Sequence, residues 1–165
     1  MIRLYEYSND WVWWGRFNDT QMDIIQQAKK QGLDIDKIDN PKLSEAQMTV
    51  ILDGLKDGVD VTKYNDPKWD FLQMDQIRKG LLNNIDLTQY IDVKTDYQVM
   101  QQIRLGLLHG LAKSQIASFN QPIYNYRQMS EIRNGIEQGL DISKFNNPKL
   151  SYKDMQAIRL KMLEA

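Results

Sequence analysis

The chain has 165 residues, and its 42% hydrophobic content is enough to bury a core, so a disordered chain is excluded. Its 21 Lys and Arg balance 22 Asp and Glu, so nothing overall attracts it to nucleic acid or an anionic membrane, and no stretch approaches the roughly 18 apolar residues of a membrane span. It has no cysteine, which excludes disulfides and thiolate zinc sites and fits the cytoplasm that we expect for it.

Residues 1–16 precede the repeats and are rich in aromatic side chains, with Trp11, Trp13 and Trp14 close together. One interpretation is an N-terminal cap over the exposed end of the first helix, because helical arrays need end caps. Another is a partner-binding patch, since tryptophan is favoured at interface hot spots. The alternation from residue 2 to residue 7 is also compatible with a short strand. The sequence leaves these alternatives open.

From residue 17 onward the chain repeats with a period of about 26 residues. Six methionines are spaced by 26, 26, 26, 29 and 26 residues, and an isoleucine follows each of them three positions later. In repeats two to six another apolar residue comes seven positions after the methionine, which completes the stripe of an amphipathic helix. We place the repeat starts near residues 17, 43, 69, 95, 124 and 150. The methionines are Met22, Met48, Met74, Met100, Met129 and Met155.

Each helix is expected to begin after an Asn, Ser or Asp that stands four residues before its methionine and can cap the free backbone N–H groups. A glutamine three residues after the cap completes a capping box in four repeats, but Val99 and Asp154 stand there in the other two. A large apolar residue before the cap in five repeats is expected to fold over the methionine as a hydrophobic staple. The caps are Asn18, Ser44, Asp70, Asp96, Asn125 and Ser151.

The helix ends are equally regular, because a residue suited to left-handed backbone and then an apolar residue close the last turn. A short helical turn with its own capping Asp, such as residues 60–64, is expected to return the chain to the next helix. Each repeat is therefore predicted to hold one helix of about 13 residues and one return turn. The predicted stop residues are Gly32, Gly58, Asn84, Gly110 and Gly139.

One such repeat cannot bury its apolar face alone, so neighbouring repeats must stack. We predict an all-α protein, a short α-solenoid of six repeats over residues 17–165. Small residues recur in mid-helix although glycine there costs about 1 kcal/mol in helix propensity, and close approach between neighbouring repeats would explain them. These residues are Ala28, Gly54, Gly80, Gly106 and Gly135.

Arginine occupies one equivalent position in the last four repeats, as Arg78, Arg104, Arg133 and Arg159. Such a ladder could present a row of guanidinium groups to carboxylates or phosphates. The alternative is structural, with each arginine paired to the recurrent aspartates or bonded to a carbonyl. These aspartates are Asp34, Asp60, Asp86 and Asp141.

Three additional residues precede repeat five, in a segment that contains Phe119, Tyr124 and Tyr126. Insertions in repeat arrays often form binding loops on one face. The alternative is a register correction filled by packed aromatic side chains. Repeat four also has Ala112 and Lys113 where the other return turns have Asp and an apolar residue, so we expect a distorted return turn there.

The sequence shows no catalytic constellation, and we expect no enzymatic activity, no cofactor and no bound metal. The only histidine, His109, lies in the last turn of a predicted helix, where a solvated side chain or one facing the helix dipole is the simpler interpretation. No second histidine or cysteine is available for a zinc site, and no phosphate-binding loop, Rossmann fingerprint or nucleophile elbow is present.

The repeat follows the pattern Gln-Met-x-x-Ile-Arg-x-Gly-Leu-x-x-Gly-Leu-Asp-(Ile/Val)-(Ser/Thr)-x-(Tyr/Phe) over roughly residues 17–165. It resembles repeats in uncharacterised proteins of Gram-positive bacteria and of their phages and mobile elements. That family supplies no activity to transfer. The resemblance implies a role between host and mobile element, such as inhibition of a defence system in the manner of an anti-CRISPR protein.

The leading hypothesis is therefore a protein-binding scaffold or inhibitor that acts on a larger protein through the solenoid surface. Its candidate contacts are the tryptophan cluster and the region around the insertion. The alternative is nucleic-acid or anion binding through the arginine ladder, which would weaken steeply with salt. A third hypothesis is end-to-end self-assembly. The sequence does not identify the partner.

Overall fold

The computed structural model describes residues 15–165, and the regular structure in that range is helical, which confirms the predicted all-α class. The chain divides into two compact units, residues 1–78 and 79–165, and each is described by itself. The predicted N-terminal strand and the cluster of Trp11, Trp13 and Trp14 lie outside the described residues. The stacking of all six repeats into one solenoid stays a prediction.

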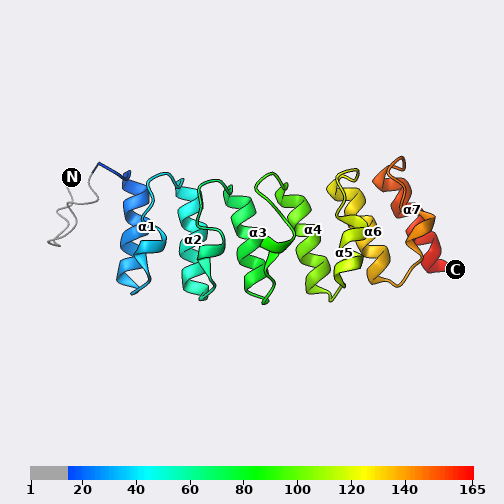
Figure 1. Ribbon diagram of the computed structural model, residues 1–165, viewed down its shortest axis with the longest axis horizontal. Coiled ribbons are helices and arrows are strands. Elements are labelled where there is room, and N and C mark those ends of the chain that lie inside the picture. The colour runs from blue at the N-terminus through cyan, green and yellow to red at the C-terminus, as the bar shows by residue number, and fades with distance from the viewer. Residues whose placement is uncertain (1–14) are drawn as a thin grey trace. The chain divides into compact units, whose positions relative to one another are not determined.

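In the first unit, α1 (Asp19–Lys30) and α2 (Glu45–Asp57) pack side by side, and α3 (Phe71–Leu81) begins there (Figure 1). Two 3₁₀ turns, Ile35–Lys37 and Val61–Lys63, connect these helices and confirm the expected helical return turns. The apolar stripes of the helices and the return turns together form the core. Its most deeply buried side chains include Ile38, Leu43, Met48, Ile51 and Tyr64.

In the second unit, α6 packs against α4, α5 and α7. The core joins the Met and Ile stripes of these helices to aromatic residues of the return segments, and includes Ile103, Phe119, Ile132, Phe145 and Met155. The elements of this unit after α3 are the 3₁₀ turn Leu87–Gln89, α4 (Tyr97–Leu108), α5 (Lys113–Phe119), α6 (Tyr126–Glu137), the 3₁₀ turn Ile142–Lys144 and α7 (Tyr152–Glu164).

The helix starts are capped as predicted, and the capping glutamine also connects consecutive repeats. Gln128 accepts the backbone N–H of Asn125 and donates from Nε2 to the carbonyl of Leu150, 2.8 Å away at the next staple position. Gln47 makes the same bond to the carbonyl of Trp69. Asp154 completes a capping box with Ser151 although it is not a glutamine. The glutamine pattern therefore encodes contacts between repeats as well as helix starts.

The helix ends also agree with the sequence. The five predicted stop residues have φ between 58° and 81°, and Asn84 is the one that is not glycine. In each case the following apolar residue donates its backbone N–H to a carbonyl five residues earlier, as Leu140 does to Gly135 at 2.9 Å. This is the Schellman pattern, which satisfies a carbonyl that the helix leaves free.

The mid-helix glycines have a different cause from the one predicted. A methyl group on Gly135 would stand 2.4 Å from Cζ of Phe145, and one on Gly54 would meet the hydroxyl of Tyr64. Both aromatic residues belong to the return turn of the same repeat, so the close approach is within a repeat and not between neighbouring repeats. Repeat one has Ala28 because its return turn carries the smaller Ile38 at the aromatic position.

Candidate protein-binding surface

The arginine ladder is engaged in hydrogen bonds and ion pairs between repeats. Nε of Arg159 donates to Oε2 of Glu131 at 2.8 Å, and both side chains are only 8% exposed. Nε of Arg133 donates in the same way to Oε1 of Gln102 at 3.2 Å. Arg104 also has interaction partners. The guanidinium groups of Arg133 and Arg159 help to hold neighbouring helices together.

The first arginine of the ladder lacks the Nε partner that Arg133 and Arg159 have. The acceptors for the Nε groups stand two residues after the methionine of the preceding repeat, and Val50 occupies that position before Arg78. The Nε atom of Arg78 is accordingly buried and has no hydrogen-bond partner among residues 15–165. Its terminal nitrogens pair with Asp57 and, at 2.9 Å, with Asp75. Burial lowers the pKa of Arg78, but these two hydrogen bonds outweigh it and raise the pKa.

Replacing Val50 by Gln should raise the free energy of unfolding by about 1 kcal/mol, because the new side chain would accept from the unpaired Nε of Arg78. Urea denaturation followed by circular dichroism would measure the change. The matched control is Ile24→Gln, since Ile24 holds the same position but faces Leu52 in place of an arginine. That variant should lose about 1–3 kcal/mol by burying an unpaired amide. If both variants lost the same free energy of unfolding, the side chain two residues after the methionine would not be the acceptor for the arginine of the next repeat.

The predicted pairing of the ladder with the recurrent aspartates is wrong for the arginines whose contacts are given above. These aspartates cap the 3₁₀ turns, as Asp141 does by accepting the backbone N–H of Ser143 at 3.1 Å. Hydrogen bonds from Thr62 and Ser143 lower the pKa of Asp60 and Asp141. A carboxylate that caps a 3₁₀ turn points its oxygens at the backbone N–H groups of that turn. The arginines therefore pair with residues of the helices instead.

The insertion before repeat five forms a helix and not a loop. The return segment of repeat four, which has Ala112 and Lys113 in place of the usual Asp and apolar residue, forms α5 and not a 3₁₀ turn. The return turn was expected to be distorted at this place. Phe119 and Tyr124 are buried, and the hydroxyl of Tyr124 donates to Oδ1 of Asn146. These two candidate contact residues therefore pack in the core, which agrees with the register-correction alternative.

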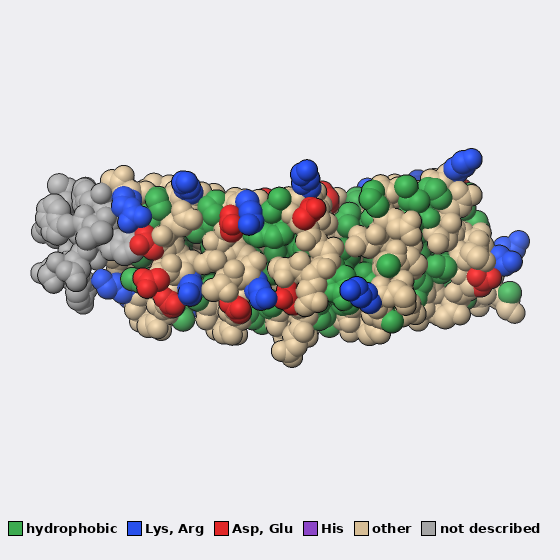
Figure 2. Space-filling view, viewed as in Figure 1, with side chains coloured by type: hydrophobic (Ala, Val, Ile, Leu, Met, Phe, Trp, Pro, Cys, Tyr) green, Lys and Arg blue, Asp and Glu red, His purple; other side chains and the backbone are tan. Residues whose placement is uncertain are grey.

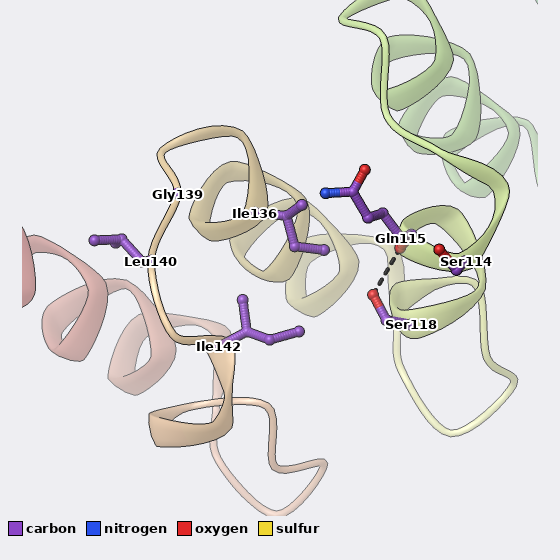
Figure 3. Close-up of a pocket in the computed structure, with 7 residues that line it drawn as sticks. All are labelled: Ser114, Gln115, Ser118, Ile136, Gly139, Leu140 and Ile142. Atoms are coloured by element: carbon purple, nitrogen blue, oxygen red, sulfur yellow. Dashed lines mark hydrogen bonds between the residues drawn. The ribbon is translucent and has the colours of Figure 1, made fainter.

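An open hollow of about 390 Å³ lies between α5 and the end of α6 (Figure 3). Ser114, Gln115 and Ser118 line one side, and the hydroxyl of Ser118 donates to the carbonyl of Gln115 at 2.6 Å. The other side is apolar, with Ile136 and Ile142 pointing into the same space. Such a mixed lining can accept an apolar side chain and one or two hydrogen bonds.

A second surface lies at the N-terminal ends of α6 and α7. The guanidinium of Arg127 lies over the ring of Tyr126 at 5.6 Å and over the ring of Tyr152 at 5.1 Å, measured to the ring centroids. Its Nε donates to the Tyr126 hydroxyl at 2.9 Å. Ile123 lies in the turn before α6. It is 59% exposed, the highest exposure among the large hydrophobic residues that the structure describes. We call Ile123, Tyr126, Arg127 and Tyr152 the aromatic edge.

The hydrogen bond within the aromatic edge stabilises the charged forms of both partners. It lowers the pKa of Tyr126 and raises the pKa of Arg127. Within residues 15–165 no carboxylate pairs with Arg127, in contrast to Arg78, Arg133 and Arg159. The aromatic edge thus presents an uncompensated positive charge between two aromatic rings.

Of this surface, only Tyr126 was among the residues singled out from the sequence. The missed signal is the first helical position, which is acidic in repeats one and two and aromatic in the next four, namely Asp19, Glu45, Phe71, Tyr97, Tyr126 and Tyr152. Ile123 also replaces a lysine that precedes the staple residue in the four other linkers of this kind, as Lys42, Lys68, Lys94 and Lys149. Position-by-position comparison of the repeats would have found both changes.

No family model, curated protein or solved structure matches this chain. In residues 15–165 no helix combines the length and apolar character needed to cross a membrane. Nor does this part of the chain gather three or more His, Asp or Glu side chains into a group that could hold a metal ion. His109 ends α4, and its Nδ1 lies 2.9 Å from Oε1 of Glu137, which also accepts from Arg133.

Proposed function

We propose that this chain is a non-enzymatic, cytoplasmic protein-binding module that contacts its partner through the aromatic edge. The observation that supports it best is the arginine held between two partly exposed tyrosines beside a strongly exposed isoleucine. Tyrosine and arginine are the residues that most often dominate interface energies, and rings held in place lose little entropy on binding. On the face drawn in Figure 2, hydrophobic side chains gather over the second unit with few charges among them.

The engagement of the arginine ladder supports protein binding over anion binding. Arg133 and Arg159 would have to leave buried partners before they could bind a phosphate, at a cost that exposed basic residues do not have. A role as an inhibitor of a host defence protein, which the resemblance implies, is one form that such binding would take. The partner in that case is a protein larger than this chain.

The test is affinity capture from a Gram-positive bacterial lysate, with and without nuclease, read by mass spectrometry. We expect one captured protein that survives nuclease and is lost with the double variant Tyr126→Ser/Tyr152→Ser. Each tyrosine should contribute about 2 kcal/mol, or about thirtyfold in Kd. The matched control is Leu108→Ser, which removes a hydrophobic side chain of 42% exposure at the C-terminal end of α4. The aromatic edge lies at the N-terminal ends of α6 and α7, so this variant should leave capture unchanged.

A further variant separates the two surfaces of the second unit. Ser114→Arg places a long side chain in the hollow beside α5 and leaves the aromatic edge intact. Loss of capture with this variant alone would assign the contact to the hollow. Capture that disappears with nuclease would replace protein binding by nucleic-acid binding.

A further inference from the structure

Arg127 differs from Arg78, Arg133 and Arg159 in having no carboxylate partner within residues 15–165, and this points to the chemistry of the partner. Its Nε–H is engaged by Tyr126, and the hydroxyl of Tyr152 also interacts with it. A guanidinium has five N–H donors in a planar fork that matches a carboxylate. The two rings hold that plane in place, so little side-chain entropy is left to lose when a carboxylate binds.

The surroundings of Arg127 carry few groups that would compete for it. The negative charge of Asp96 acts on the pKa of Tyr126, and the Asp96 side chain caps α4 by accepting the N–H of Gln98 at 2.7 Å. Asp154 is likewise engaged, with Ser151. The second unit as a whole has eleven Lys and Arg against eight Asp and Glu, a net charge of +3. An approaching acidic group therefore meets a favourable field and a guanidinium that is hydrogen-bonded to tyrosine hydroxyls but is paired with no carboxylate of residues 15–165.

We propose that the aromatic edge binds an acidic segment of the partner protein, an inference that rests on the proposed function. An Asp or Glu carboxylate of that segment pairs with the terminal nitrogens of Arg127. An apolar side chain next to it packs on Ile123, which is 59% exposed and would gain by burying that area. The ring contacts of Arg127 occupy the space between Tyr126 and Tyr152, so a nucleic-acid base cannot stack between the two rings.

The test is selection of random short peptides displayed on phage against the immobilised full-length chain. We expect enriched peptides to carry Asp or Glu next to an apolar residue. Arg127→Gln should weaken binding of the best synthetic peptide at least about tenfold. Arg127→Lys should retain the acidic preference with weaker binding, because lysine keeps the charge but not the planar fork. Arg127→Glu should shift the selection to peptides with Lys or Arg.

Thermal unfolding followed by circular dichroism would confirm that these variants of an exposed residue stay folded. Enriched peptides without acidic residues, or binding that is indifferent to Arg127, would overturn the acidic segment. If such peptides still required Tyr126 and Tyr152, the proposed function would stand and only the partner chemistry would fail. Enrichment that depends on neither tyrosine would overturn both.

A fluorescent single-stranded oligonucleotide tests the alternative of nucleic acid. If it binds more tightly than any selected peptide, and if Arg127→Gln abolishes that binding, nucleic acid would replace the acidic segment as the ligand.

Discussion

Replacing Glu131 by Ala should lower the free energy of unfolding by about 3 kcal/mol, because it leaves the guanidinium of Arg159 buried without its carboxylate. The two groups are 2.8 Å apart, and within residues 15–165 the arginine makes one further hydrogen bond, from a terminal nitrogen to Gln138 at 3.0 Å. Burial prevents water from replacing the lost partner. Urea denaturation of the full chain, followed by circular dichroism, would measure the loss.

The repeat provides a graded control for this experiment. Glu131→Gln should lose only about 1 kcal/mol, since Gln102 accepts from Arg133 at the equivalent position in the preceding repeat. The double variant Glu131→Ala/Arg159→Leu should recover most of the stability, because no charge is then left buried. Losses of the same size for Ala and Gln would show that Arg159 reaches solvent in the absence of Glu131.

Replacing Gly135 by Ala should lower the free energy of unfolding by about 2 kcal/mol, although alanine is the better helix former. The new methyl group would stand 2.4 Å from Cζ of Phe145 and 3.4 Å from Cγ2 of Ile142. Phe145 is completely buried and belongs to the core of the second unit, so it cannot move aside without opening other contacts. The same denaturation experiment measures this variant.

A second substitution should rescue this loss. Gly135→Ala/Phe145→Ile reproduces the combination of Ala28 and Ile38 that repeat one uses, where both residues are buried. The double variant should be more stable than the sum of the two single losses predicts, with a coupling energy of about 1–2 kcal/mol. Additive losses would mean that the return-turn aromatic does not determine the small residue.

Local structure was predictable because each signal acts over a few residues. The caps, the capping boxes and the left-handed stops depend on backbone groups at most five residues away, and the structure confirms them, with Asn84 at φ 58° as one example. The return turn in repeat four was expected to be distorted from Ala112 and Lys113, but its form as an α-helix was not foreseen. Whether this segment forms a helix or a loop depends on whether Phe119 can reach the core, which is a matter of tertiary packing.

The surface was less predictable, because exposure is a property of packing. Phe119, Tyr124 and Tyr126 look alike in the sequence, yet the first two are buried and only the third reaches the aromatic edge. The sequence places Arg127 at a different repeat position from the ladder arginines, but it does not show which of these guanidinium groups has a partner. Arg133 and Arg159 donate from Nε to an amide or a carboxylate on the helix of the preceding repeat, which lies 28 residues away for Arg159.

The sequence by itself determined the all-helical class, the length of the repeat, the place where each of the six repeat helices begins and the place where the first five end, since all of these follow from the order of residues along one short segment. Only the tertiary structure decided which arginine side chains are paired with a carboxylate and which can still bind another molecule. That decision needs residues from two repeats at once, as Arg159 with Glu131 and Arg127 with Tyr152 show. Ion pairing and burial depend on distances in space, and the linear pattern does not contain those distances.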